Sequence, residues 1–120
     1  MEWTFRSDRP IYAQLVEQMT QAILSGTFAP GERLPAVREF ATQAGVNPNT
    51  MQRAMAELEQ QGLIYAQRTN GRFVTGDTTA IGSVRDRVAR QRVSSFAADM
   101  GRLGYHKEQV LQLLREEEVF

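Results

Sequence analysis

The stretch Gly45-Val46-Asn47-Pro48-Asn49-Thr50 is the corner that decides the fold, because it joins two segments with helical apolar patterns. Glycine accepts the left-handed conformation that ends a helix, and Pro48 suits the first turn of the next one. Asn47 can cap that second helix with its side chain. Two helices separated by so short an interval must meet at a steep angle, so the stretch predicts a helix-turn-helix.

Apolar residues recur at helical spacing on both sides of the corner. They predict helices over residues 35–44 and 48–61, and a further helix over residues 10–25. Before the first of these, Trp3 and Phe5 form an alternating segment that either adds a strand or caps the domain. The residues expected in the core are Ile11, Leu15, Met19, Ala22, Ile23, Val37, Phe40, Ala41, Met51, Ala54, Met55 and Leu58.

Two strand-like runs, residues 63–67 and 72–75, follow the helix at 48–61. Asn70-Gly71 stands between them and indicates a hairpin, because both residues accept positive φ. Helix, turn, helix and hairpin in this order predict a winged helix-turn-helix, which places one helix in the DNA major groove. Arg68 and Arg72 flank the tip and would lie at the phosphate backbone or minor groove. A plain surface hairpin with solvated arginines is the alternative.

The helix at 48–61 has a second face that suits the reading of bases. Asn49, Gln52, Arg53 and Ala56 recur there at helical spacing. Amides can read base edges, arginine can pair with guanine or phosphate, and a small alanine permits close approach. A solvated helix face is the alternative, but the position directly after the corner favours base reading. The predicted DNA-facing residues are Arg38, Asn47, Asn49, Thr50, Gln52, Arg53, Arg68, Asn70, Gly71 and Arg72.

Composition limits the other classes of function. Fourteen basic and fourteen acidic residues cancel, so the electrostatic footprint for DNA is weak and suits a dimer better than a monomer. The absence of cysteine excludes a thiolate zinc site, and His106 is the sole histidine. Lys107 is the only lysine, and its place beside a helix start does not suit a Schiff base. We expect neither an enzyme nor a cofactor or metal.

No apolar run approaches the ~20 residues of a membrane span, and the acidic, aromatic start does not resemble a signal peptide. We therefore expect a cytoplasmic protein without a membrane partner.

Residues 77–120 are expected to form a two-helix dimerisation domain after a winged domain at 1–76, in a mostly helical α+β fold. The helices are predicted over residues 81–103 and 106–118. Two amphipathic helices of this size cannot bury their apolar faces alone, so they must pack on the winged domain or on a second copy of themselves. A second copy is the more economical alternative, because symmetric DNA sites need two-fold proteins. The predicted dimer interface consists of Val84, Val88, Phe96, Met100, Leu111 and Leu114.

Several motifs resemble the GntR-type bacterial transcriptional regulators. They are Pro10-Ile11-Tyr12-x-Gln14-Leu15, Gly26-x-Phe28-x-Pro30-Gly31-Glu32-Arg33-Leu34-Pro35-x-x-Arg38-x-Phe40-Ala41, Gly45-Val46-Asn47-x-Asn49-Thr50, Leu58-Glu59-x-x-Gly62-Leu63-Ile64 and Gly71-x-Phe73-Val74. The short helical tail looks like the YtrA subfamily, which pairs the winged helix with a small dimerisation domain and is often associated with ABC-transporter operons. The 44 residues after Gly76 are too few for the large metabolite-binding domains of other members.

This chain departs from the family pattern at positions that bear on DNA reading. Many members have arginines where Pro48 and Gln52 stand, and a serine where Ala36 stands. In the wing, Arg72 stands where a threonine is frequent, so it can supply a charge that the threonine does not. The operator sequence therefore does not follow from the resemblance.

The resemblance implies a homodimeric, sequence-specific regulator that acts as a repressor on a palindromic operator. A transporter operon is a possible target, and an unknown small-molecule effector is a possible partner. The competing hypothesis is a winged helix used for protein–protein contact, which the neutral charge favours.

Overall fold

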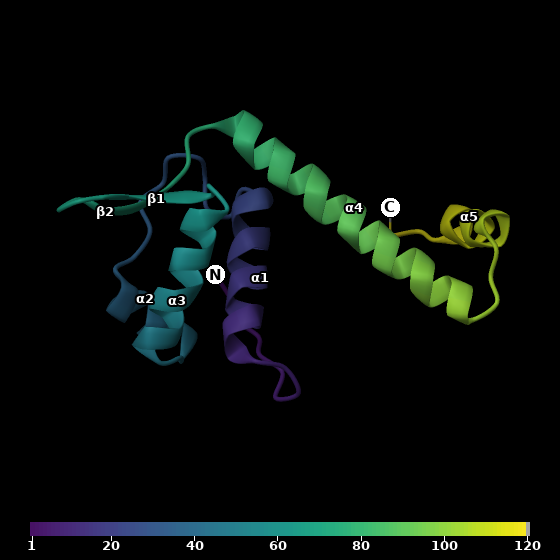
Figure 1. Ribbon diagram of the computed structural model, residues 1–120, viewed down its shortest axis with the longest axis horizontal. Coiled ribbons are helices and arrows are strands. Elements are labelled where there is room, and N and C mark those ends of the chain that lie inside the picture. Colours follow the sequence, from purple (N-terminus) through teal and green to yellow (C-terminus); the bar gives the residue numbers. More distant parts are fainter. Residues whose placement is uncertain (120) are drawn as a thin grey trace. The chain divides into compact units, whose positions relative to one another are not determined.

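The computed structural model describes residues 1–119, which form two compact units: residues 1–84, called here the winged unit, and the residues from Arg85 onward, called the tail unit. Figure 1 shows the elements in chain order: α1 (Ile11–Leu24), α2 (Val37–Ala44), α3 (Pro48–Gln60), β1 (Ile64–Gln67), β2 (Gly71–Val74), α4 (Thr78–Arg102) and α5 (Lys107–Glu116). This mostly helical α+β order, with one two-stranded sheet, confirms the predicted fold class.

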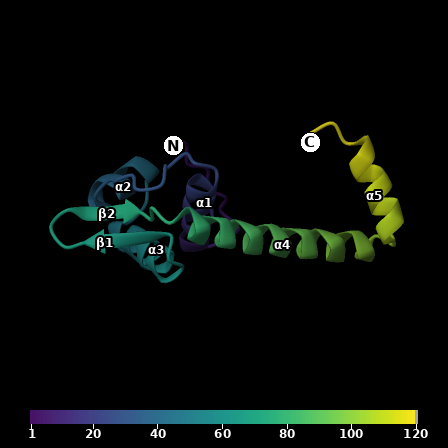
Figure 2. The same cartoon turned by 90° about the horizontal axis from the view of Figure 1, so that it is seen from above.

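The core of the winged unit lies where α1 and α2 pack on α3, and Figures 1 and 2 show α1 beside α3 from two directions. Ile11 was expected in this core but is 37% exposed, because it is the first residue of α1 and lies at the end of the packed stripe. Val37, the first residue of α2, is only half-buried. The largest fully buried side chains are Leu15, Met19, Phe40, Met51, Met55, Leu58, Leu63 and Val74.

The segment before α1 caps the core instead of adding a strand. The ring of Trp3 meets Phe40 edge to face, with 5.4 Å between centroids. The amide of Gln14, which is 4% exposed, ties the segment to α1. Its Oε1 accepts from the Arg6 N–H at 2.7 Å, and its Nε2 donates to the carbonyls of Arg6 and Arg9 at 2.8 and 2.9 Å. Gln14 therefore pairs with backbone groups of the segment that precedes α1 and fixes that segment to the helix.

The hairpin pairs β1 antiparallel to β2, from Ile64 opposite Val74 to Gln67 opposite Gly71. The expectation that both residues of Asn70-Gly71 take positive φ is wrong for Asn70, because positive φ in the described chain occurs only at glycines. The Asn70 N–H donates to the Gln67 carbonyl at 2.7 Å and closes the turn. Only Gly71, at φ +97°, then needs the conformation that favours glycine.

Residues 32–34 lie along the other side of β2 and widen the wing. The Leu34 N–H donates to the Arg72 carbonyl at 2.8 Å, and the Val74 N–H donates to the Glu32 carbonyl at 2.8 Å. Arg33 forms an isolated antiparallel bridge with Phe73. The sequence did not predict this backing segment.

The two compact units divide inside α4, between Val84 and Arg85, whereas the sequence placed a boundary at residue 76. The reason is that Ile81 and Val84, in the first turns of α4, are 4% and 8% exposed and belong to the winged unit. Val84 was predicted to face a second copy, and we correct that assignment because its own chain already covers it.

The tail unit contains the rest of α4 and α5, joined through Gly104 at φ +88°. His106 occupies the position before α5, where its backbone N–H donates to Gln109 Oε1 at 2.8 Å. In residues 1–119, no helix is both long enough and apolar enough to cross a membrane.

Candidate nucleic-acid interface

The corner between α2 and α3 has the geometry that the cap residues predict. Gly45 follows the last residue of α2 with φ +71°, and the Val46 N–H donates back to the Ala41 carbonyl at 3.0 Å. Asn47 has extended backbone, and its Oδ1 accepts from the Asn49 N–H at 2.8 Å. Asn47 therefore caps the start of α3, so this member of the predicted DNA-facing set also has a structural role.

The outer face of α3 is polar and open to solvent. Asn49, Gln52, Arg53 and Ala56 are all exposed, and Thr50 is half-buried at the first turn. The opposite face carries the buried residues of the core. The structure therefore brings the predicted base-reading residues to one accessible surface, at the spacing that a major groove can accept.

Arg53 lies on the flank of α3 that faces α1. Its guanidinium carbon is 4.1 Å from the centroid of the Tyr12 ring, within the range of a cation–π contact. The Tyr12 hydroxyl approaches Glu57 Oε2 at 3.5 Å, so the same ring also contacts the next turn of α3. Arg53 therefore packs against the Tyr12 ring at the protein surface.

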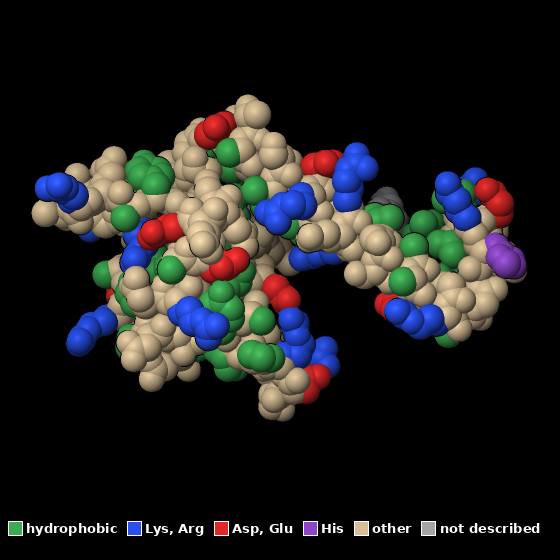
Figure 3. All heavy atoms as spheres, viewed as in Figure 1, with side chains coloured by type: hydrophobic (Ala, Val, Ile, Leu, Met, Phe, Trp, Pro, Cys, Tyr) green, Lys and Arg blue, Asp and Glu red, His purple; other side chains and the backbone are tan. Residues whose placement is uncertain are grey.

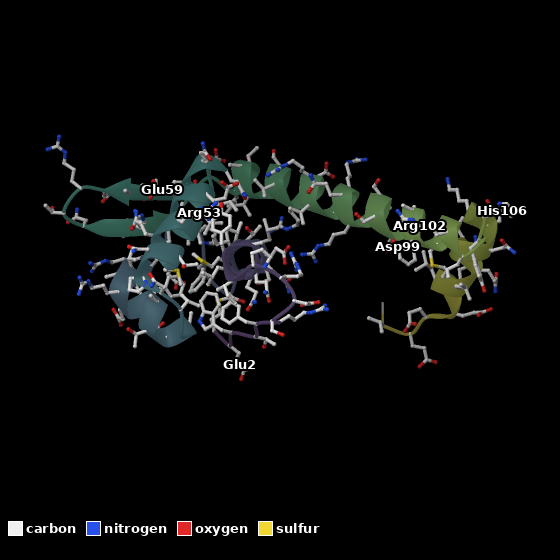
Figure 4. The ribbon with its side chains drawn as sticks, turned by 60° about the horizontal axis from the view of Figure 1, so that its bottom comes forward. Glu2, Arg53, Glu59, Asp99, Arg102 and His106 are labelled. Atoms are coloured by element: carbon white, nitrogen blue, oxygen red, sulfur yellow. The ribbon has the colours of Figure 1, made fainter. Side chains whose placement is uncertain are left out.

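Arg72 lies on the opposite flank of α3, where the wing meets the helix. Its Nε donates to Glu59 Oε1 at 2.5 Å, and its Nη1 donates to Gln52 Oε1 at 3.4 Å. The side chains of Arg72 and Glu59 are only 21% and 33% exposed. Figure 4 labels Glu59 together with Arg53, and both come from α3. The charge of Arg72 is thus compensated inside the protein and links the wing to α3.

Arg38 on α2 and Arg68 at the wing tip differ from these two residues. Both are exposed, and in residues 1–119 neither forms an ion pair. Asn70 is exposed beside Arg68, and Gly71 is half-buried against Arg33. Figure 3 shows basic and acidic side chains interspersed over the winged unit, in keeping with the neutral net charge. Arg38 and Arg68 are therefore two exposed cations of the winged unit that have no acidic partner among the described residues.

Sequence reasoning assigned no role to Tyr12 or Glu59, although the structure places both beside the predicted interface. Glu59 stands seven positions after Gln52, so helical periodicity alone could have placed it on the same side of α3. Tyr12 lies within the Pro10-Ile11-Tyr12 motif, but nothing local in the sequence indicates that its ring meets a helix 41 residues later.

The comparisons with known proteins agree with this geometry. A family model described as "Bacterial regulatory proteins, gntR family" matches residues 11–74, which run from the start of α1 to the end of β2. The chain belongs to the GntR family.

Two relatives from Bacillus subtilis match nearly the whole chain. The uncharacterized HTH-type transcriptional regulator YhcF is 35% identical over 93% of this chain and 93% of its own length. The HTH-type transcriptional repressor YtrA is 32% identical over 92% of this chain and 86% of its own length. The tail unit is therefore part of the similarity to both, which supports a relationship to YtrA itself. Both relatives are described as transcriptional regulators, a class of protein that does not act by catalysis.

Solved structures show the same fold. A GntR family transcriptional regulator from Listeria monocytogenes is 38% identical, with a TM-score of 0.89 over 95% of this chain and 100% of that one. The DNA-binding domain of AraR, solved in complex with operator ORX1, is 31% identical, with a TM-score of 0.57 over 62% of this chain and 96% of that one. This chain is a DNA-binding regulator of the GntR family with a helical C-terminal part.

Proposed function

We propose that this GntR-family regulator is a homodimeric repressor that binds a palindromic operator, with α3 in the major groove and the wing against the backbone. The observation that carries the proposal is the exposed polar face of α3, which has the wing beside it and the exposed Arg68 at the wing tip. Base-reading side chains on a helix next to a wing form a recognition surface of this class. The similarity to the AraR domain solved with its operator supports the docking of this unit on duplex DNA.

The tail unit supports the homodimer. Between α4 and α5 it has an apolar groove of about 590 Å³, lined by side chains that include Phe96, Tyr105, Leu111 and Leu114. Figure 3 shows hydrophobic side chains gathered on this unit. Val93, which also lines the groove, is 65% exposed, and Leu103, just after the end of α4, is 72% exposed. A second copy of the tail unit would remove this surface from water and align two winged units on one operator.

Repression is proposed by analogy with YtrA, whose description is that of a transcriptional repressor. We place the protein in the cytoplasm because the DNA it would regulate lies there in bacteria. We propose a transporter operon as its target because the chain resembles the YtrA subfamily. A small-molecule effector would act through the apolar groove or under the wing. Since α4 belongs to both units, a change in the tail could reach the winged unit through this helix.

Selection of duplexes from a random library by the full-length chain tests the function. We expect a palindromic site with two half-sites, and an affinity that falls steeply as salt rises. Replacing Arg38 or Arg68 by glutamine should weaken all sequences alike and lower the salt slope by about 1 each. If no sequence is selected and binding is indifferent to salt, the winged helix is instead a protein-contact module.

A further inference from the structure

We propose that Arg72 specifies sequence indirectly, by holding the amide of Gln52 in the orientation that presents its N–H groups to DNA. This inference rests on the proposed function, because it assigns a base-reading role to α3. It makes Arg72 a positioning residue instead of the phosphate contact that its place in the wing predicts. Gln52 then acts as a hydrogen-bond donor whose orientation depends on two residues that do not themselves read the base.

The three side chains form a continuous path from α3 to the wing and back. Glu59 Oε1 accepts from Arg72 Nε at 2.5 Å, and Gln52 Oε1 accepts from Arg72 Nη1 at 3.4 Å. Glu59 and Gln52 both come from α3, seven positions apart, so two helical turns fix their separation. The planar guanidinium, with its donors in a rigid fork, can serve both acceptors at once.

A phosphate contact by Arg72 would disrupt this arrangement. The side chain is only 21% exposed, and its Nε and Nη1 already donate to Glu59 and Gln52, so turning the guanidinium toward the backbone of DNA would draw it away from Glu59. Glu59 would then remain unpaired beside a polyanion, which is electrostatically unfavourable. Arg68, three residues before Gly71 at the tip of the same hairpin, is exposed and unpaired in the described chain, so it is the better phosphate ligand.

The orientation of the Gln52 amide has a direct chemical consequence. Because Oε1 accepts from Arg72, the Nε2 group carries the two hydrogens that remain for an external partner. A donor of this kind suits the acceptors in the major groove, such as guanine O6 and N7 or thymine O4. Without the arginine the amide could rotate and offer either its oxygen or its nitrogen, so the preference at that base pair would relax.

The test compares base preferences of the full-length protein and its variants on the site that the wild type selects. Arg72→Lys keeps the charge but lacks the two-pronged donor, and Glu59→Gln removes the carboxylate that holds Arg72. Each variant should reduce the preference at one base pair per half-site by about 5-fold or more, the lower end for a specific side-chain contact to a base. The same position should lose its preference in Gln52→Ala, and the salt slope should not change in any of the three.

Arg68→Lys and Arg68→Gln are the matched controls in the same hairpin. Arg68→Lys should behave like the wild type, and Arg68→Gln should weaken every sequence to the same extent. The thermal unfolding midpoint of each variant shows whether the fold is retained, and Glu59→Gln provides a second route if Arg72→Lys does not fold.

Three results would overturn the inference. The first is that Arg72→Gln lowers the salt slope by about 1 without a change in base preference. The second is that Glu59→Gln tightens the binding of all sequences, and the third is that Arg72→Lys retains the wild-type base preference. If the wild type selects no sequence, the proposed function itself fails. These outcomes are separate, because the inference is tested only on a site that the wild type prefers.

Discussion

The predicted DNA-facing set contains four arginines, and they form two groups that differ in how their side chains are held. Arg53 lies on the Tyr12 ring and Arg72 is bound by Glu59, whereas Arg38 and Arg68 extend into solvent without an ion pair in the described chain. Immobilising a free arginine side chain costs up to about 2 kcal/mol of rotamer entropy. The two held residues have already lost part of this freedom on folding, so they suit contacts of defined geometry, and the two free ones suit general attraction to phosphate.

Tyr12→Leu should weaken operator binding by about 2- to 5-fold, the equivalent of losing a surface cation–π contact worth ~0.5–1 kcal/mol. The loss arises because Arg53 becomes free to move away from its position beside α3. Fluorescence anisotropy with a labelled operator measures the change. Tyr12→Phe keeps the ring and serves as the control, so an equal loss in both variants would show that the hydroxyl, and not the ring, matters.

At the scale of the elements, α3 and the wing each depend on one residue with special backbone or cap chemistry. The first turn of α3 is held by the Asn47 side chain, and the hairpin turn is completed by Gly71. Both residues lie in the predicted DNA-facing set, yet both already have a structural task in the free protein. Substituting either residue should therefore lower the free energy of unfolding of the free protein, whether or not the residue contacts DNA.

Asn47→Ala should lower the free energy of unfolding by about 1 kcal/mol, the usual cost of losing a helix cap. Asn47→Ser retains an oxygen that can accept from the same backbone N–H, so it should stay within a few tenths of a kcal/mol of the wild type. Urea denaturation followed by circular dichroism measures both. Equal stability of the alanine and serine variants would contradict the capping role.

Gly71→Ala should destabilise the protein by about 1–2 kcal/mol, because an L-residue at φ +97° is strained. Its new Cβ would also lie 3.3 Å from Arg33 Nε, so that side chain would have to shift. Gly76→Ala is the matched control, since a Cβ there has no neighbour within 4 Å and the backbone is not left-handed. Denaturant midpoints of the two variants should differ clearly, and similar midpoints would refute the argument.

At the scale of the whole molecule, the two parts of α4 belong to different units and have different roles. Its first turns complete the core of the winged unit through Ile81 and Val84. Beyond Arg85, the side chains of α4 and α5 are mostly exposed or half-buried, and α5 has only ten residues. Helices of that length are marginal in water on their own. The tail unit should accordingly gain much of its stability from a second copy.

Phe96→Glu should convert the proposed dimer into a monomer at micromolar concentration, because it places a charge in the apolar groove. Sedimentation equilibrium measures the change, and affinity for the full palindrome should fall much more than affinity for a half-site. Ser94→Glu adds the same charge at an exposed position that does not line the groove. A wild type that is monomeric at this concentration yet binds a palindrome tightly would refute the dimeric role of the tail.

The parts of the fold that the sequence could predict are those that depend on neighbouring residues. Gly45, Asn47 and Pro48 specify the corner through their own backbone and cap preferences, so the helix-turn-helix was readable. The contacts of Arg72 with Glu59 and of Arg53 with Tyr12 join residues 13 and 41 positions apart. Such pairs depend on how the elements pack, which is why neither contact was predicted, although helical periodicity places Glu59 on the same side of α3 as Gln52. The burial of Val84 by its own chain depends on packing in the same way.

Lysine occurs only once in this chain, at Lys107 on the edge of the apolar groove. Apart from His106, every other basic side chain is an arginine, which amine-reactive reagents do not modify. Lysine-directed covalent chemistry is therefore limited to the tail unit and leaves the predicted DNA-facing residues untouched. A fluorophore attached to Lys107 would report whether the groove is covered while the recognition surface stays chemically native. The predicted DNA-facing surface is equally beyond the reach of lysine acetylation, so that modification cannot alter its charge.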